Sequence, residues 1–273
     1  MPQDVQVAQI TPVNRASLWL AAVGFLVLAI GSIGVGWLPT FDRYNFALQV
    51  LGPWLIAVAL LVEWRTHVER RGWAAFIFFM IGILTFGALW IPYVMNPGSL
   101  GTPSATQLGF IMAGIASISA SIGTFMVMMR KEAQLAHPIY SVEPPIKATF
   151  VQLLCFGLGT LLYGVDFIWV GDEETNHAQF SLLLVSIVMI LIAVVSFNSS
   201  LTVQFGRPAV LVATLAVLLY ALNYVLRVLP SWTDEEWRLG LLMTGVAYVL
   251  GAVASALAAI HKASAANSRL SPG

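Results

Sequence analysis

The chain has 273 residues, of which 59% are hydrophobic and 10% are charged, and its mean hydropathy is +0.85. Soluble domains carry about 25% charged residues, so the composition excludes an ordinary soluble enzyme and a disordered tail. The 13 Lys and Arg residues balance the 13 Asp and Glu residues, which leaves no basic surface for nucleic acid. A single cysteine, Cys155, excludes an intrachain disulfide and a cysteine-based zinc cluster. The class that remains is a polytopic membrane protein in contact with the lipid bilayer.

Eight apolar stretches are each long enough to cross the hydrocarbon core as a helix, which takes about 20 residues. They are residues 17–38, 46–63, 73–95, 107–129, 148–170, 179–204, 208–229 and 239–261. Their apolar runs are continuous rather than alternating, which excludes a transmembrane β-barrel. The first stretch is followed by no signal-peptidase pattern, so we expect a retained helix. The sequence predicts an all-α membrane protein with eight transmembrane helices.

Basic residues are distributed unevenly between the two sides of this arrangement. Ten of the 13 fall on the side that holds both termini, whereas Arg43, Arg227 and Arg238 fall on the other. Basic loops are retained in the cytoplasm, so both termini are predicted to be cytoplasmic. A bacterial-type inner membrane is the expected location.

One predicted helix in each half aligns with the other without gaps. Residues 108–117 read LGFIMAGIAS and residues 239–248 read LGLLMTGVAY, and the same offset of 131 places Lys131 on Lys262. Four helices per half would give both halves the same orientation, as in parallel repeats of transporters. We therefore predict a tandem repeat of two four-helix units, residues 1–135 and 148–273, joined by a cytoplasmic linker with prolines at 136–147.

The two aligned helices also carry small residues at every fourth position. The stripes are Gly109, Ala113, Ser117 and Ser121 in one helix and Gly251, Ser255 and Ala259 in the other. Small residues at this spacing allow two membrane helices to approach closely. The stripes agree with packing within the chain, or with an interface to a homo-oligomer or a larger membrane complex.

Polar residues inside the predicted spans are the candidates for function, because ionisable groups are costly in a bilayer. The seventh span carries a stripe spaced three or four residues apart: Tyr220, Asn223, Tyr224 and Arg227. The fifth span carries a second stripe: Thr160, Tyr163 and Asp166. Each stripe lies on one side of its helix, and both helices run outward. We predict a polar vestibule open to the exterior, with Asp166, Arg227, Tyr163, Tyr220, Asn223 and Tyr224 as ligand-binding residues. The alternative is a buried Asp166–Arg227 ion pair that fixes helix packing.

Other chemistry has little support in the sequence. No histidine lies in mid-span, so haem ligation is not expected. The acidic loop residues 172–174 and 234–236, together with His177, could bind a divalent cation, but the second cluster follows Thr233 in the pattern of a helix N-terminus. No catalytic motif occurs. We therefore predict no catalytic residues, no metal and no cofactor.

Two function classes follow from these observations. The first is a small permease or channel-like facilitator of a solute or an ion. The alternative is a non-catalytic integral subunit or scaffold of a larger membrane complex. A membrane-embedded enzyme acting on a lipid or a quinone is a third.

Overall fold

The structure, a computed structural model, describes residues 15–37, 43–99, 103–134, 150–170, 177–196, 201–202, 205–227 and 236–270. These residues form helices and short connections, with no strand among them. Continuous apolar sequence folds as helix in a membrane because a helix pairs its backbone N–H and C=O groups within the segment. The prediction of an all-helical chain is confirmed.

The long helices follow one another with few additional elements. In chain order they are α1 (Arg15–Trp37), α2 (Arg43–Val62), α3 (Trp64–Arg71), α4 (Trp73–Ala88), α5 (Ile91–Met95), the 3-10 helix η1 (Pro97–Ser99), α6 (Pro103–Gln134), α7 (Phe150–Val170), α8 (His177–Ser196), α10 (Arg207–Arg227) and α11 (Glu236–Leu270).

Within the described residues, six segments are long and apolar enough to cross a membrane. They are Arg15–Trp37, Arg43–Val62, Trp73–Met95, Gln107–Met129, Phe150–Trp169 and Arg238–Ser264. Shorter apolar stretches, Leu182–Ser196 and Arg207–Asn223, lie in α8 and α10. These segments support an integral, multi-pass membrane protein with extensive lipid contact.

Some helix boundaries differ from the predicted ones. The predicted third span is interrupted at Leu89 and Trp90, between the end of α4 and the start of α5. Pro92 occupies the first turn of α5, a position where its missing N–H costs no hydrogen bond. The short helix α3 was not predicted; it ends at Gly72, whose φ of 91° suits glycine. The predicted sixth span reaches residue 204, whereas α8 ends at Ser196 and residues 197–200 lie outside the described part.

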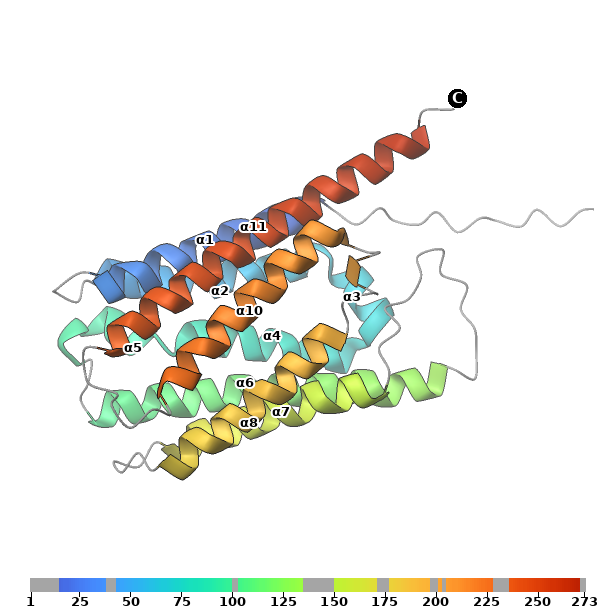
Figure 1. Ribbon diagram of the computed structural model, residues 1–273. Coiled ribbons are helices and arrows are strands. Elements are labelled where there is room, and N and C mark those ends of the chain that lie inside the picture. Colours follow the sequence, from blue (N-terminus) through green and yellow to red (C-terminus); the bar gives the residue numbers. More distant parts are fainter. Residues whose placement is uncertain are drawn as a thin grey trace, which may run out of the picture.

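The eight long helices pack in a closed ring that follows chain order. Each packs on the next, as the pairs α1–α2, α2–α4, α4–α6, α6–α7, α7–α8, α8–α10 and α10–α11 show, and α11 returns to pack on α1. In Figure 1, α1 and α11 lie together along one edge of the bundle and α6, α7 and α8 along the opposite edge. The first and last helices therefore close the bundle.

Each helix of the ring turns an apolar face outward, as α1 illustrates. Trp19, Val23, Leu26 and Ile30 recur three or four residues apart and are 47–53% exposed, whereas Leu28 is buried. This spacing places the four exposed side chains on one side of the helix. Large apolar side chains exposed in a continuous stripe suit contact with lipid tails.

The small-residue stripes pack against other helices of the same chain. Ser121 of α6 donates a hydrogen bond of 2.7 Å to the carbonyl oxygen of Gly157 in α7. A Cβ atom placed on Gly251 of α11 would lie 3.2 Å from the ring of Phe25 in α1. The stripes therefore serve packing within the chain.

Candidate functional site

Two tyrosines join helices that are separated in the ring by α8. The hydroxyl oxygens of Tyr163 in α7 and Tyr220 in α10 lie 3.4 Å apart, and either can be the donor. Both side chains pack against a buried apolar cluster formed by Leu183, Ile187 and Ala221. The structure thus brings together the polar stripes predicted on the fifth and seventh spans.

Asp166 lies one helical turn beyond Tyr163 on α7. Its side chain is 2% exposed, and its Oδ1 atom has no hydrogen-bond partner in the described part of the chain. The six described spans contain no other acidic residue. A buried carboxylate oxygen without a partner among the described residues is a costly feature, which is why Asp166 stands out as the centre of the candidate site.

Asn223 occupies the corresponding position on α10, one turn beyond Tyr220. It is 2% exposed, and its Nδ2 atom donates a 3.3 Å hydrogen bond to the hydroxyl of Thr244 in α11. Its Oδ1 atom has no hydrogen-bond partner among the described residues. Asn223 therefore links α10 to α11, while its amide oxygen has no partner among the described residues.

Three predicted residues contribute less to this arrangement, or cannot be located. The hydroxyl of Thr160 donates to backbone carbonyls of its own helix, at Phe156 and Gly157. Tyr224 and Arg227 lie on α10, but their side chains are outside the described part of the structure. The predicted pairing of Asp166 with Arg227 therefore stays a prediction.

Aromatic contacts extend the site to residues that sequence reasoning missed. The ring of Tyr220 lies 6.4 Å from that of Tyr248 in α11, which lies 6.4 Å from that of Phe25 in α1. On the other side, the rings of Tyr163 and Phe167 are 4.7 Å apart. Tyr248 follows Thr244 by one turn on α11, and this spacing was the signal that could have identified both.

The first half of the chain holds its own buried polar contacts. Gln49 of α2 donates to the hydroxyl of Ser32 in α1 at 2.5 Å, and both are buried. Just beyond the end of α2, Glu63 accepts a 2.6 Å hydrogen bond from Ser17 and lies 4.0 Å from Nε2 of His67. These side chains are paired with one another, so they hold helices together rather than offer a binding group.

A metal site would need several ligating side chains close together. Within the described residues, no group of three or more His, Cys, Asp or Glu side chains could hold a metal ion. The acidic loop residues 172–174 and 234–235 fall outside the described residues, and the side chain of Glu236 is likewise not described.

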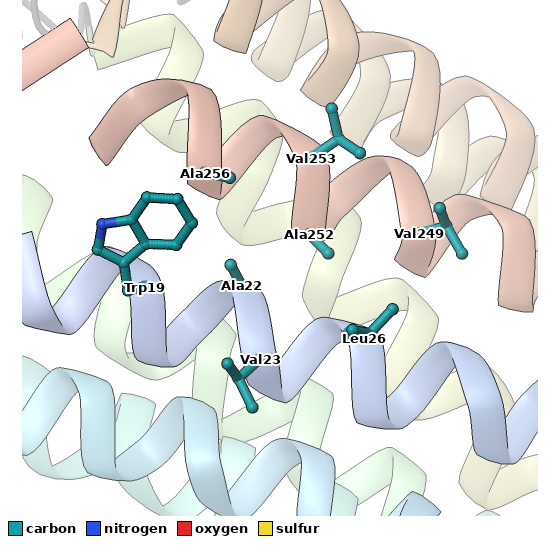
Figure 2. A pocket seen from close by; sticks show the side chains of 8 residues that line it. All are labelled: Trp19, Ala22, Val23, Leu26, Val249, Ala252, Val253 and Ala256. Carbon is teal, nitrogen blue, oxygen red and sulfur yellow. The ribbon is translucent and has the colours of Figure 1, made fainter. Parts of the chain in front are cut away.

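A separate groove of about 310 Å³ lies on the outer surface between α1 and α11, as Figure 2 shows. It is lined by Trp19, Ala22, Val23, Leu26, Val249, Ala252, Val253 and Ala256. These side chains are apolar apart from the indole N–H, so the groove offers nothing to an ion or a polar solute. It lies apart from the polar residues described above.

Comparisons of the chain with protein-family models, curated proteins and solved structures give no match. Its function is therefore argued from the geometry of its own residues.

Proposed function

We propose that the chain is a small facilitator of a solute or an ion, with eight transmembrane helices and a ligand site on the polar faces of α7 and α10. The observation that carries this proposal is Asp166, a buried carboxylate with an unpartnered oxygen, inside a spanning helix. Ionisable residues in that setting usually serve transport or ligand binding. The site comprises Asp166, Tyr163, Tyr220 and Asn223, with Tyr224 and Arg227 assigned to it from their positions on α10.

The packing of α8 and α10 supports eight spans. The two helices contain 20 and 21 residues, which corresponds to a length of about 30 Å, the thickness of a hydrocarbon core. As a pair they pack in the ring between α7 and α11, which both contain spanning segments. Helices of that length beside spanning helices would cross the membrane with them.

The order of the ring supports two equivalent halves. If α1, α2, α4 and α6 are exchanged for α7, α8, α10 and α11, every neighbouring pair of the ring becomes another neighbouring pair. This is the relation expected of a parallel repeat about an axis along the membrane normal. The repeat units remain 1–135 and 148–273, with the linker at 136–147.

Glycines that allow two helices to approach closely occur at matching positions in the two halves. A Cβ atom on Gly24 of α1 would lie 2.9 Å from the carbonyl oxygen of Gly52 in α2. One on Gly159 of α7 would lie 2.8 Å from the carbonyl oxygen of Ser186 in α8. The seams between the first two helices of each half are thus built in the same way.

The seams that join the halves match as well. A Cβ atom on Gly114 of α6 would lie 2.7 Å from the carbonyl oxygen of Gly164 in α7. Gly245, the aligned residue in α11, would place a Cβ atom 3.2 Å from the carbonyl oxygen of Ala29 in α1. This agreement supports a pseudo-two-fold arrangement of the ring.

Two further glycines occupy matching positions. Gly72 and Gly206 are the described residues with positive φ, at 91° and 86°, and each directly precedes a helix, α4 or α10. A glycine with positive φ therefore directly precedes the third long helix of each half.

The two ends of the described chain lie on the same side of the bundle, which agrees with termini in one compartment. The guanidinium of Arg15, at the start of α1, donates to the carbonyl oxygen of Ala263, near the end of α11, at 3.5 Å. With the bias of basic residues, we assign this side to the cytoplasm, and a bacterial-type inner membrane stays the expected location.

The facilitator explains the structure better than the subunit alternative. The small-residue stripes, which are one of three features that favoured a larger complex, contribute to packing within the chain through Ser121 and Gly251. Compact loops and zero net charge agree with either function.

Transport in proteoliposomes tests the proposal. The purified full chain is reconstituted and challenged with gradients of potassium chloride, potassium acetate, urea and glycerol, while light scattering reports vesicle volume. We expect a faster response than in protein-free vesicles for at least one probe, and its loss in Asp166→Asn and Tyr220→Phe. Val165→Ala, on the exposed side of α7, is the matched control and should keep the wild-type rate. A response equal to protein-free vesicles for every probe, together with a stoichiometric partner in mild detergent, would establish the subunit instead.

A further inference from the structure

We propose that Asp166 is a proton-binding site, and that uptake and release of a proton there is coupled to transport. The second statement rests on the proposed function, whereas the first concerns the side chain alone. The chemical step is simple: a carboxylate oxygen and a proton form a carboxylic acid, and the reverse step returns the proton.

The location of Asp166 carries the first part of the argument. The residue lies only four positions before Val170, the last residue of α7, so a side chain turned outward could reach water. It is nevertheless 2% exposed. A carboxylate kept out of water at a membrane boundary has lost hydration that it could have retained, and it must be neutralised or paired.

The neighbouring helices bring no charged partner within their described side chains. α7 packs against α6 and α8, and neither Gln107–Met129 nor Leu182–Ser196 contains an acidic or basic residue. The titratable groups nearest along the stripes are Tyr163 and Tyr220, whose hydroxyls face each other. The side chains of His177 in α8 and Arg227 in α10 are outside the described part, so both enter the experiment as variants.

A proton suits this site better than a metal cation does. Hard cations take about six or more oxygen ligands, and the described residues contain no cluster of metal-ligating side chains. At the level of Asp166, the described oxygens without a hydrogen-bond partner are Oδ1 of Asp166 and Oδ1 of Asn223. Both are acceptors when the carboxyl is ionised, and a proton converts one of them into a donor.

The direction of the helices places these two oxygens at the same depth. α7 and α10 run the same way along the bundle, since α8 runs back between them (Figure 1). Asp166 lies three residues beyond Tyr163, and Asn223 three beyond Tyr220. The two tyrosines therefore lie at one depth in the bundle, and the acceptor oxygens of Asp166 and Asn223 lie about one helical turn further toward the ends of α7 and α10.

Infrared difference spectroscopy tests proton binding without any assay of transport. The full chain in nanodiscs is titrated with pH, and the carbonyl stretch of a protonated carboxylic acid is followed in H₂O and D₂O. We expect a band that disappears as the pH rises, shifts in D₂O, and is absent in Asp166→Asn. Glu63→Gln, which removes the acid at the inner end of α2, should keep the band. Asp166→Glu should retain a titrating band at a shifted frequency, which guards against loss of folding in the asparagine variant.

Proton flux tests the coupling. Proteoliposomes that contain a pH-sensitive dye receive an imposed pH gradient, and we expect proton movement that falls to the protein-free rate in Asp166→Asn and is unchanged in Val165→Ala. A band that depends on Asp166 without proton flux would uphold the binding site and contradict the coupling to transport. An identical band in wild type and Asp166→Asn would overturn the proposal. So would a band that appears only in Arg227→Gln or His177→Gln, because Asp166 would then be an ionised partner of that residue.

Discussion

Alanine at Gly24 or at Gly159 should destabilise the protein to a similar degree, because both glycines allow two helix backbones to touch. A Cβ atom on Gly24 would lie 2.8 Å from Cγ1 of Ile56 and 2.9 Å from the carbonyl oxygen of Gly52. On Gly159 the corresponding distances are 2.9 Å to Cγ1 of Ile190 and 2.8 Å to the carbonyl oxygen of Ser186. Isoleucine can rotate away, but a backbone carbonyl cannot.

The magnitude follows from two opposing effects. Ordinary contacts begin at 3.4 Å, so each pair of helices must separate by a few tenths of an ångström. Overpacking of this kind typically costs about 1–3 kcal/mol. Alanine recovers up to about 1 kcal/mol of helix propensity over glycine. Because a backbone carbonyl cannot rotate away, we expect a cost in the upper part of that range, about 2–3 kcal/mol, and therefore a net loss of about 1–2 kcal/mol for each variant. The two losses should add, since the sites share no contact.

Unfolding in mixed detergent micelles, followed by circular dichroism, measures this loss. Gly98→Ala is the control, because its Cβ atom would lie 3.5 Å from the nearest atom, Oδ1 of Asn96, and its stability should change by less than about 0.5 kcal/mol. If Gly24→Ala and Gly159→Ala were as stable as this control, the close backbone approach would be wrong. If only one of them were destabilised, the two seams would not be equivalent.

Three further predictions concern packing and topology. Ala256→Phe should fill the groove between α1 and α11 and raise the thermal midpoint of unfolding, whereas a lowered midpoint would show that the groove cannot take a ring. Gln49→Leu should destabilise the protein by about 1–3 kcal/mol in the same micelle assay, because it leaves the buried hydroxyl of Ser32 without its donor; adding Ser32→Ala should restore part of the loss, and no recovery would mean that the pair is not coupled. A reporter active only outside the cytoplasm should be silent when fused after Gly273 and active when inserted at Glu174, and the reverse pattern would invert the proposed orientation.

The groove and the opposite seam illustrate how the two halves differ in detail. In the seam between α6 and α7, the ring of Phe125 packs on Gly157, and a Cβ atom there would lie 2.8 Å from it. Under the proposed repeat, Ala256 corresponds to Phe125 and Ala22 corresponds to Gly157. The α1–α11 seam therefore lacks the ring that fills its counterpart, which is why a phenylalanine at Ala256 is expected to fit.

Local sequence patterns predict part of the candidate site but not how its helices meet. Helical spacing alone places Tyr163 and Asp166 on one side of α7, and Tyr220 and Asn223 on one side of α10. The spacing does not indicate which neighbouring helix each of these sides contacts. The contact between the two tyrosines depends on how α7 and α10 pack around α8. The hydrogen bond from Asn223 to Thr244 depends on how α10 packs on α11.

The proposed repeat is only partly visible in the sequence. The gapless offset is 131 between Gly114 and Gly245, but 135 between Gly24 and Gly159. Loops of different length change the register, so a single offset reveals only one of the four helix pairs. Apolar residues also substitute freely for one another in lipid-facing positions, which leaves glycines at close contacts as the positions that correspond best.

The sequence by itself determined that the protein is helical, that it belongs in a membrane and where most of its long helices lie. Those properties depend on local hydropathy and on the need of each segment to satisfy its own backbone in lipid. Only the tertiary structure decided that α11 packs on α1 and closes the ring, and that Asp166 is buried rather than open to water. It also decided that a short additional helix, α3, forms and ends at Gly72. These features depend on how the shapes of distant helices fit together, because hydropathy cannot rank one apolar neighbour above another in a membrane.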